Sequence, residues 1–212
     1  MIYKKIKRLL DIILSLIGII ILLPLLLIVA IAIKLESKGP IIFRQERLGL
    51  NGKVFKLYKF RSMCVGAEKS GVYETKGDVR VTKIGKFIRK TSIDEFPQFL
   101  NIIKGDMSII GPRPTLTYHP WPYEEYTEEQ KKRFNFRPGV TGWAQINGRK
   151  DVRWDKRIEY DVDYVENLSF GFDVKIFFGT IIKVMTMQDN VNIGKTANKS
   201  SKTQGAEKPL KM

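Results

Sequence analysis

The sequence predicts an α+β, mostly helical protein with a proline-broken N-terminal membrane helix, further amphipathic helices and a small β-hairpin element. Three observations lead to this fold class: an uncharged apolar run from Ile12 to Ile33, alternation of apolar and cationic residues around Asn51-Gly52, and helix-period stretches further on. We expect a membrane-anchoring helix over 1–38, a cytoplasmic-face domain over 39–193 and a disordered polar tail over 194–212.

The composition limits the chain to one core and points to an anionic partner. A chain of 212 residues fits one domain. Its single cysteine, Cys64, cannot form an intramolecular disulfide, which is typical of a reducing compartment. The 37 Lys and Arg exceed the 22 Asp and Glu and give a formal net charge of +15. Nucleic acid, anionic lipid and phosphorylated small molecules all stay open as partners on charge alone.

The apolar N-terminal run is about as long as the roughly 20 residues that cross a bilayer. Pro24 lies in its middle, lacks an N–H and collides with the carbonyl four residues earlier, so we expect a kink there. The two arms, of roughly 12 and 9 residues, each reach only half of the hydrocarbon core, and both flanks are cationic. A hairpin that enters and leaves one leaflet fits, and an ordinary kinked transmembrane helix is the alternative. We expect Asp11 to pair with Arg8 on one helical face.

Residues 41–63 predict a β-hairpin. Apolar and cationic residues alternate on both sides of Asn51-Gly52, a dipeptide that favours a two-residue turn. On the second strand Lys59 and Arg61 point to the same side. Two neighbouring cations repel unless an anion lies between them, so phosphate contact is one hypothesis and solvated edge-strand side chains are the other.

Further along, two amphipathic stretches, at 82–90 and 172–185, place apolar residues at helical spacing beside lysines. Each could lie on an anionic membrane surface or pack onto the core.

Two adjacent acids, Asp94 and Glu95, begin a third helix, over 92–104, which we expect to end at Gly105. Ser92 and Glu95 match a capping box, or Asp94 is the cap with Pro97 in the first turn. The free N–H groups of a helix N-terminus favour ionised carboxylates, which would make Asp94 an anion ready to act as nucleophile or metal ligand. Ordinary helix capping is the competing interpretation.

Two loops rich in Gly and Pro surround arginines. Arg113 lies in "GPRP", and Arg137 and Arg149 bracket the glycines of "RPGVTGWAQINGR". The fork of an arginine suits a phosphate, and glycines let a backbone approach a diphosphate closely. Trp143, in the second loop, could cover a base or a ring, or simply pack.

Taken in order, the motifs resemble the small bacterial phosphoglycosyl transferases of the monotopic type, the initiating sugar-phosphate transferases of glycoconjugate assembly. The resemblance covers about residues 4–190. It is carried by the proline-broken helix and by four motifs: "IIFRQERLGLNGKVFKLYKFRSM", "SIDEFPQFLNIIKGDMSIIGPRP", "RPGVTGWAQINGR" and "IEYDVDYVENLSFGFDVKI". It implies a re-entrant helix, surface helices in the interface and an active site at the cytoplasmic face of the bacterial inner membrane. Leu23, before the proline, departs from the serine of a close relative.

The resemblance implies transfer of a sugar 1-phosphate from a UDP-sugar to a polyprenol (undecaprenyl) phosphate, with release of UMP, through a covalent aspartyl-phosphosugar intermediate. Asp94 matches the nucleophile and Glu95 the second acid, and Mg²⁺ is the implied cofactor, placed on Glu95 and, beside it, Asp94. Inner membrane lipid is a further partner, nucleic acid is not, and a homo-oligomer and the identity of the sugar stay open. The cations that match the family's phosphate-binding positions are Lys59, Arg89, Arg113 and Arg149.

Two functions from other classes remain as alternatives. "DVD" at 161–163 matches the Asp-x-Asp pattern of metal-dependent glycosyltransferases, although the flanking Tyr160 and Tyr164 indicate a surface helix face. A membrane-tethered nucleic-acid binder would use the same positive charge, but the cations lie in Gly-Pro loops and not along one stripe. His119 is the only histidine in the sequence, which argues against histidine-based catalysis and histidine-rich metal sites.

Overall fold

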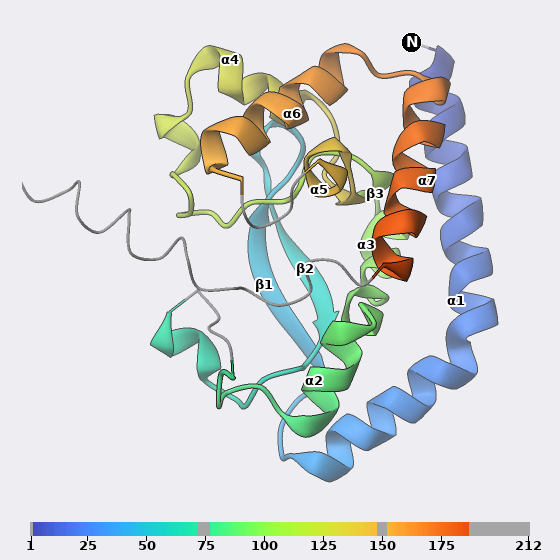
Figure 1. The fold of residues 1–212 in the computed structure, drawn as a ribbon, viewed down its shortest axis with the longest axis vertical. Helices are drawn as coiled ribbons and strands as arrows, with labels where there is room; N and C mark the ends of the chain where they lie inside the picture. The colour runs from blue at the N-terminus through green and yellow to red at the C-terminus, as the bar shows by residue number, and fades with distance from the viewer. Residues whose placement is uncertain (1, 72–76, 148–151, 187–212) are drawn as a thin grey trace, which may run out of the picture.

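The computed structural model describes residues 2–71, 77–147 and 152–186. In this part of the chain helices surround a central β-hairpin, as Figure 1 shows, so the predicted mostly helical architecture with a small hairpin is confirmed. The predicted tail, 194–212, lies outside the described residues. The helices are α1 (Ile2–Glu36), α2 (Lys83–Lys90), α3 (Gln98–Lys104), α4 (Glu128–Lys131), α5 (Trp143–Ile146), α6 (Trp154–Glu166) and α7 (Phe170–Met185), and the strands are β1 (Ile42–Leu48), β2 (Val54–Phe60), β3 (Ser108–Ile110) and β4 (Gly139–Thr141).

Helix α1 forms one edge of the molecule (Figure 1). It is continuous over 35 residues with Pro24 inside it, which at 1.5 Å per residue makes it about 50 Å long. The ribbon bends in its C-terminal half, as expected beyond a proline that cannot donate its backbone hydrogen bond. Among the described residues it is the one helix long and apolar enough to cross a membrane, and few of its residues are buried. These features indicate membrane association.

A buried polar stripe joins the N-terminal half of α1 to the rest of the protein. Lys7, Asp11 and Ser15 lie at four-residue spacing, so they share one face of the helix, and all three are buried. Lys7 Nζ lies 2.7 Å from Asp173 Oδ2 of α7, and Asp11 Oδ2 accepts a hydrogen bond of 2.7 Å from the Ser108 hydroxyl. The stripe therefore fixes the rotation of α1 against the domain behind it.

The predicted pairing of Asp11 with Arg8 is wrong. Arg8 Nη1 instead donates to the carbonyl oxygen of Ile102 at 2.7 Å, in the last turn of α3. Arg137 Nε donates to the carbonyl oxygen of Gly105 at 2.8 Å, just past the same helix end. Two cations at a helix C-terminus satisfy carbonyls without helical partners and complement the helix dipole.

The hairpin forms as predicted, but its loop is longer. Strands β1 and β2 pair antiparallel down to Leu48 opposite Val54, so the connection spans 49–53 and the expected two-residue turn is wrong. Asn51 and Gly52 do adopt left-handed backbone, with φ of 54° and 72°. They sit inside a short 3₁₀ turn, and this changes the strand register.

The two amphipathic helices each pack one face on the core. In α2, Ile88 is fully buried while Phe87 is exposed, and in α7, Ile176 is fully buried while Phe177 and Phe178 are exposed. Core packing is therefore confirmed for one face of each helix. Membrane contact of the exposed apolar face stays a prediction.

Strands β3 and β4 form a short parallel pair that brings the two Gly-Pro loops together. A Cβ on Gly139 would lie 2.1 Å from the backbone nitrogen of Gly111, and one on Gly142 would lie 2.1 Å from the carbonyl oxygen of Gly111. Only glycine permits this backbone contact. Close packing of the two loops therefore explains these glycines without the predicted approach to a diphosphate.

Candidate active site

The acidic pair lies on a tight turn between α2 and α3. A 3₁₀ turn spans Ile93–Glu95, and α3 begins only at Gln98. Ser92 has a left-handed φ of 58°, and its side chain caps no backbone N–H, so the predicted capping box is wrong. The alternative cap, Asp94, is also wrong, because Pro97 stands at the cap position of α3. The acids are held by a sharp reversal of the chain and not by helix capping.

Apolar packing supports this turn from behind. Ile93 is 8% exposed and belongs to one cluster with Val29 and Ile33 of α1 and Ile88 of α2. The next residue, Asp94, is itself only 8% exposed. The apolar helix α1 thus shares one core cluster with the residue beside Asp94, and this shared packing ties the acidic turn to the membrane-associated helix.

The two carboxylates differ in their surroundings. Glu95 Oε1 lies 2.7 Å from Lys59 Nζ of β2. Burial raises the pKa of Asp94 from its ordinary 3.8 to about 6; the Lys59 and Arg89 cations oppose this rise and the Glu95 carboxylate adds to it. The expectation that a helix N-terminus would favour the ionised form is therefore wrong in direction. Asp94 still ionises below neutral pH, so at pH 7 most molecules carry it as a carboxylate.

A hollow beside Glu95 collects cations. Its lining includes three of them, Arg47, Lys59 and Arg113, and one carboxylate, Glu95, which is already paired with Lys59. The Arg113 guanidinium donates to no acceptor in the part of the chain that the structure describes. Buried or half-buried arginines without carboxylate partners favour binding of an anion, and their planar forks fit phosphate oxygens.

Arg47 is the site residue that sequence reasoning missed. Its Nη1 donates to the carbonyl oxygen of Pro114 at 3.0 Å and its Nη2 to Gln45 Oε1 at 2.6 Å, while its Nε is buried without a partner. Burial first, and then the Arg113 cation, lower the pKa of Arg47 to about 10. The signal in the sequence was the period of two along β1, which in the observed register sets Arg47 and Lys59 on one face of the hairpin.

The remaining predicted phosphate ligands fall in different places. Arg89, at the end of α2, acts electrostatically on Asp94 but is absent from the lining of the hollow. Arg149 lies outside the described residues. The structure therefore brings together Lys59, Glu95 and Arg113, with Arg89 on the Asp94 side.

Two further residues have structural roles. Arg61 is 5% exposed and donates to the carbonyl oxygens of Ser37 and Lys38 at 2.7 and 3.0 Å, so it caps the end of α1 and the predicted shared phosphate contact with Lys59 is wrong. Trp143 packs edge-on against Phe172, with ring centroids 4.9 Å apart, which favours the packing interpretation.

The donor set fits a metal shared with a substrate. In the described part of the chain no three His, Cys, Asp or Glu side chains gather, so at this site the described residues offer the adjacent pair Asp94 and Glu95. Mg²⁺ is commonly bound by one or two carboxylates plus phosphate oxygens of a substrate and water. The residues present fit that arrangement and exclude an all-protein cage among the described residues.

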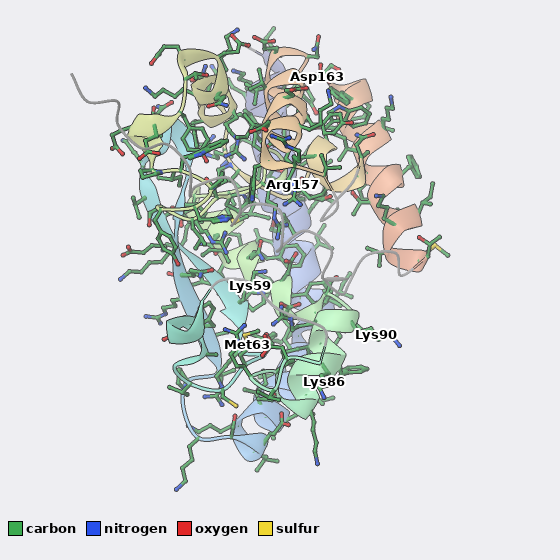
Figure 2. The ribbon with its side chains drawn as sticks, turned by 60° about the vertical axis from the view of Figure 1, so that its left-hand side comes forward. Lys59, Met63, Lys86, Lys90, Arg157 and Asp163 are labelled. Atoms are coloured by element: carbon green, nitrogen blue, oxygen red, sulfur yellow. The ribbon has the colours of Figure 1, made fainter. Side chains whose placement is uncertain are left out.

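The "DVD" segment does not form a metal site. Asp161 is 1% exposed and is bonded to Arg133, whereas Asp163 accepts a hydrogen bond of 2.8 Å from Asn167 on the opposite side of α6. Figure 2 shows Asp163 near the top of the molecule, well above Lys59. Tyr164 is fully buried, so the predicted surface face is wrong at that residue. The two aspartates cannot hold one ion together.

Comparison with known proteins places this chain in a family. The bacterial sugar transferase family matches residues 2–187. The chain belongs to the bacterial sugar transferase family. One relative is the UDP-glucose:undecaprenyl-phosphate glucose-1-phosphate transferase of Escherichia coli K12, 44% identical over 186 residues, which are 85% of this chain and 40% of the relative.

Other bacterial sugar transferases match over a similar region. The sugar transferase EpsL of Bacillus subtilis 168, named as uncharacterized, is 48% identical over 157 residues, 74% of this chain and 75% of the relative. The UDP-N-acetylgalactosamine-undecaprenyl-phosphate N-acetylgalactosaminephosphotransferase of Aeromonas hydrophila is 45% identical over 189 residues, 87% of this chain and 45% of the relative. The chain thus spans less than half the length of the Escherichia and Aeromonas proteins.

Proposed function

We propose that this bacterial sugar transferase moves a sugar 1-phosphate from a UDP-sugar to a polyprenol phosphate, with undecaprenyl phosphate as the natural acceptor, and releases UMP. The observation that carries the proposal is the buried Asp94 carboxylate beside the Glu95–Lys59 pair, at the edge of a hollow that also contains Arg47 and Arg113. The printed names of the relatives describe this class of transfer.

The reaction proceeds in two displacements at one phosphorus. An oxygen of the Asp94 carboxylate attacks the phosphorus that bears the sugar, a P–O bond forms, and the bond to the UMP oxygen breaks. The product is an aspartyl-phosphosugar. An oxygen of the polyprenol phosphate then attacks the same phosphorus, which forms the polyprenol diphosphate sugar and frees the Asp94 carboxylate. Dividing the transfer in this way avoids bringing two phosphorylated anions together in one step.

The cations of the hollow neutralise the charge that this chemistry concentrates. Arg47, Lys59 and Arg113 are placed to hold the diphosphate of the donor, and Arg89 lies on the Asp94 side, where the incoming acceptor phosphate would also need a cation. Mg²⁺, held by Glu95 and Asp94 together with substrate phosphate oxygens, would supply further charge neutralisation and orient the leaving group. Although burial raises the pKa of Asp94 to about 6, this value is still below neutral pH, so the carboxylate in the partly dehydrated turn is mostly ionised and able to attack.

The position of α1 in the membrane determines where the active site meets the polyprenol phosphate. We place α1 in the cytoplasmic leaflet of the bacterial inner membrane as a re-entrant helix bent at Pro24, with the active site on the cytoplasmic face. Support comes from the bend, from the core cluster that Val29 and Ile33 share with Ile93, and from the exposed apolar faces of α2 and α7. A polyprenol phosphate held in that leaflet would present its phosphate at the height of Asp94.

The test is a UMP-release assay on the full chain in detergent or nanodiscs, with undecaprenyl phosphate, Mg²⁺ and a panel of UDP-sugars. The relatives' names suggest UDP-glucose and UDP-N-acetylgalactosamine as the first donors. Donor labelled in the phosphate next to the sugar should leave label on the protein when acceptor is omitted, and Asp94→Asn should abolish both label and UMP. Release of UDP instead of UMP, or full activity of Asp94→Asn, would refute the proposal.

A further inference from the structure

Arg113 reaches the hollow from the loop at 112–115, and the carbonyl oxygens of all four of these residues accept hydrogen bonds. Two of its residues are prolines and have no N–H to donate, so the loop depends on donors from elsewhere. The bonds come from three separate parts of the fold: Pro112 O accepts from Gly139 N at 2.8 Å, Arg113 O from Arg133 Nη2 at 2.8 Å, Pro114 O from Arg47 Nη1 at 3.0 Å, and Thr115 O from Leu48 N at 2.9 Å.

The backbone of Arg113 is hydrogen-bonded by a buried ion pair. Arg133 and Asp161 are each 1% exposed. Arg133 Nε and Nη2 lie 3.2 and 2.5 Å from Asp161 Oδ2, the same Nη2 lies 2.8 Å from the Arg113 carbonyl oxygen, and Asp161 Oδ1 accepts from the Arg113 N–H at 3.4 Å. The pair therefore contacts both backbone polar groups of one residue.

Stability alone does not account for such a pair. Taking two charges out of water costs about as much as their attraction returns, and apolar residues of the same volume often serve stability equally well. A buried pair that bonds to both the N–H and the carbonyl oxygen of one residue has a different effect: it fixes the position of that residue's Cα. The Arg113 guanidinium, at the end of that held backbone, donates no hydrogen bond to any of the described residues.

We propose that Asp161 and Arg133 are positioning residues, which hold the Arg113 backbone so that its guanidinium meets the substrate diphosphate in the hollow. This inference rests on the proposed function and adds to it: the first aspartate of "DVD" acts from behind the site through Arg113. A side chain mounted on a held backbone loses less conformational entropy when it binds, and a misplacement of about 1 Å can cost on the order of a hundredfold in rate.

A double-mutant cycle tests the inference on the full chain in detergent or nanodiscs. Asp161→Asn should lower kcat/KM for UMP release about 10- to 100-fold. In an Arg113→Ala background the same substitution should lower it by no more than about threefold, because the positioned group is already gone. Asp163→Asn, on the same helix but exposed, is the matched control and should stay near wild type. Equal fold-losses from Asp161→Asn in both backgrounds would overturn the inference, because a general loss of folding stability acts regardless of Arg113.

A second variant and a second readout keep the test decisive. Arg133→Lys retains the charge beside Asp161 but lacks the fork that reaches both Asp161 and the Arg113 carbonyl, so it should show the same dependence on Arg113 if Asp161→Asn does not fold. The cycle is repeated on binding of UDP, which carries the diphosphate common to all UDP-sugars. A wild-type protein that binds UDP without releasing UMP would refute the proposed function. In that case, coupling between Asp161 and Arg113 in UDP binding would still support the positioning role, whereas additive effects of the two substitutions would refute the positioning role.

Discussion

Replacing Asp94 with Asn should abolish transfer and at the same time make the folded protein more stable. The folded-state pKa of about 6 lies above the ordinary 3.8, because the carboxylate is buried. Folding therefore favours the protonated form: the resulting stabilisation is complete below pH 3.8 and is lost as the pH rises through 6. A shift of about two pKa units at 1.36 kcal/mol each corresponds to about 3 kcal/mol, which the ionised Asp94 costs the native state at pH 7 and above.

Asn has the shape of the neutral carboxyl and carries no charge to dehydrate, so the variant should recover that free energy. Thermal unfolding followed by tryptophan fluorescence, from pH 5 to pH 8 in one detergent, measures the difference. At 2–4 °C per kcal/mol for a chain of this size, the gain at pH 8 should be about 6–12 °C. It should shrink to about half at pH 5, where much of wild-type Asp94 is already protonated in the folded state.

Two comparisons separate this effect from a general response to lost charge. Glu95→Gln should show no comparable gain, because Glu95 is paired with Lys59 at 2.7 Å and its loss leaves that cation alone. Asp163→Asn, on an exposed side chain, should change little. The reasoning is wrong if Asp94→Asn is no more stable than wild type at pH 8, or if its gain does not diminish toward pH 5.

Three further outcomes are expected. UMP release should fall about tenfold per pH unit below about pH 6, because Asp94 takes up a proton there. Measuring kcat against pH at saturating donor tests this, and a flat profile down to pH 5 would contradict it. Arg47→Gln should raise the KM for the UDP-sugar about 10- to 100-fold, because one charge-assisted hydrogen bond to the substrate is lost. Arg44→Gln, on the exposed side of the same strand, should leave KM unchanged, and equal effects of the two substitutions would contradict the assignment. Lys7→Met should lower the free energy of unfolding in chemical denaturation by about 3–5 kcal/mol, because it leaves buried carboxylates unpaired. Lys5→Met, at an exposed position, should change it very little. Similar denaturation midpoints for both variants would contradict a structural role for Lys7.

The elements that could be predicted from the sequence are those with a long or strong local signal. The apolar run with Pro24 inside it and the hairpin around Asn51-Gly52 appear where the pattern placed them. The third helix ends before Gly105 as predicted, but it begins at Gln98 and not at residue 92. Each depends on residues close together in the chain, so periodicity and turn chemistry suffice. The lengths of their connections were not determined by that signal.

The capping box failed because an acidic pair before an apolar helix has more than one local solution. Ser92 and Glu95 have the right spacing, yet the chain must bring Ile93 into the cluster with α1 and α2. Tertiary packing of Ile93 outweighs a cap worth about 1 kcal/mol, and the turn forms with Ser92 at positive φ. The sequence placed the carboxylates at the right position but could not supply their burial, and burial decides the pKa of Asp94.

Arg47 was missed through strand register. A two-residue turn at Asn51-Gly52 would pair Arg47 with Lys56 and set it on the face opposite Lys59. The observed loop pairs Arg47 with Phe55, and this slip of one residue brings Arg47 to the Lys59 face. The composition of the hollow therefore depends on a one-residue shift in strand register, which no periodicity within either strand reveals.

The bend of α1 and the acidic turn belong to one arrangement. Along its length α1 meets α7 through Lys7, then α3, where Gly18 lies within 3.2 Å of Phe99 if given a Cβ. Its C-terminal part then shares one apolar cluster, through Val29 and Ile33, with Ile93 of the acidic turn. Pro24 lies between the last two of these regions, and the ribbon changes direction in the C-terminal half of the helix (Figure 1). The bend therefore lets the second arm of α1 join the cluster that supports the turn carrying Asp94.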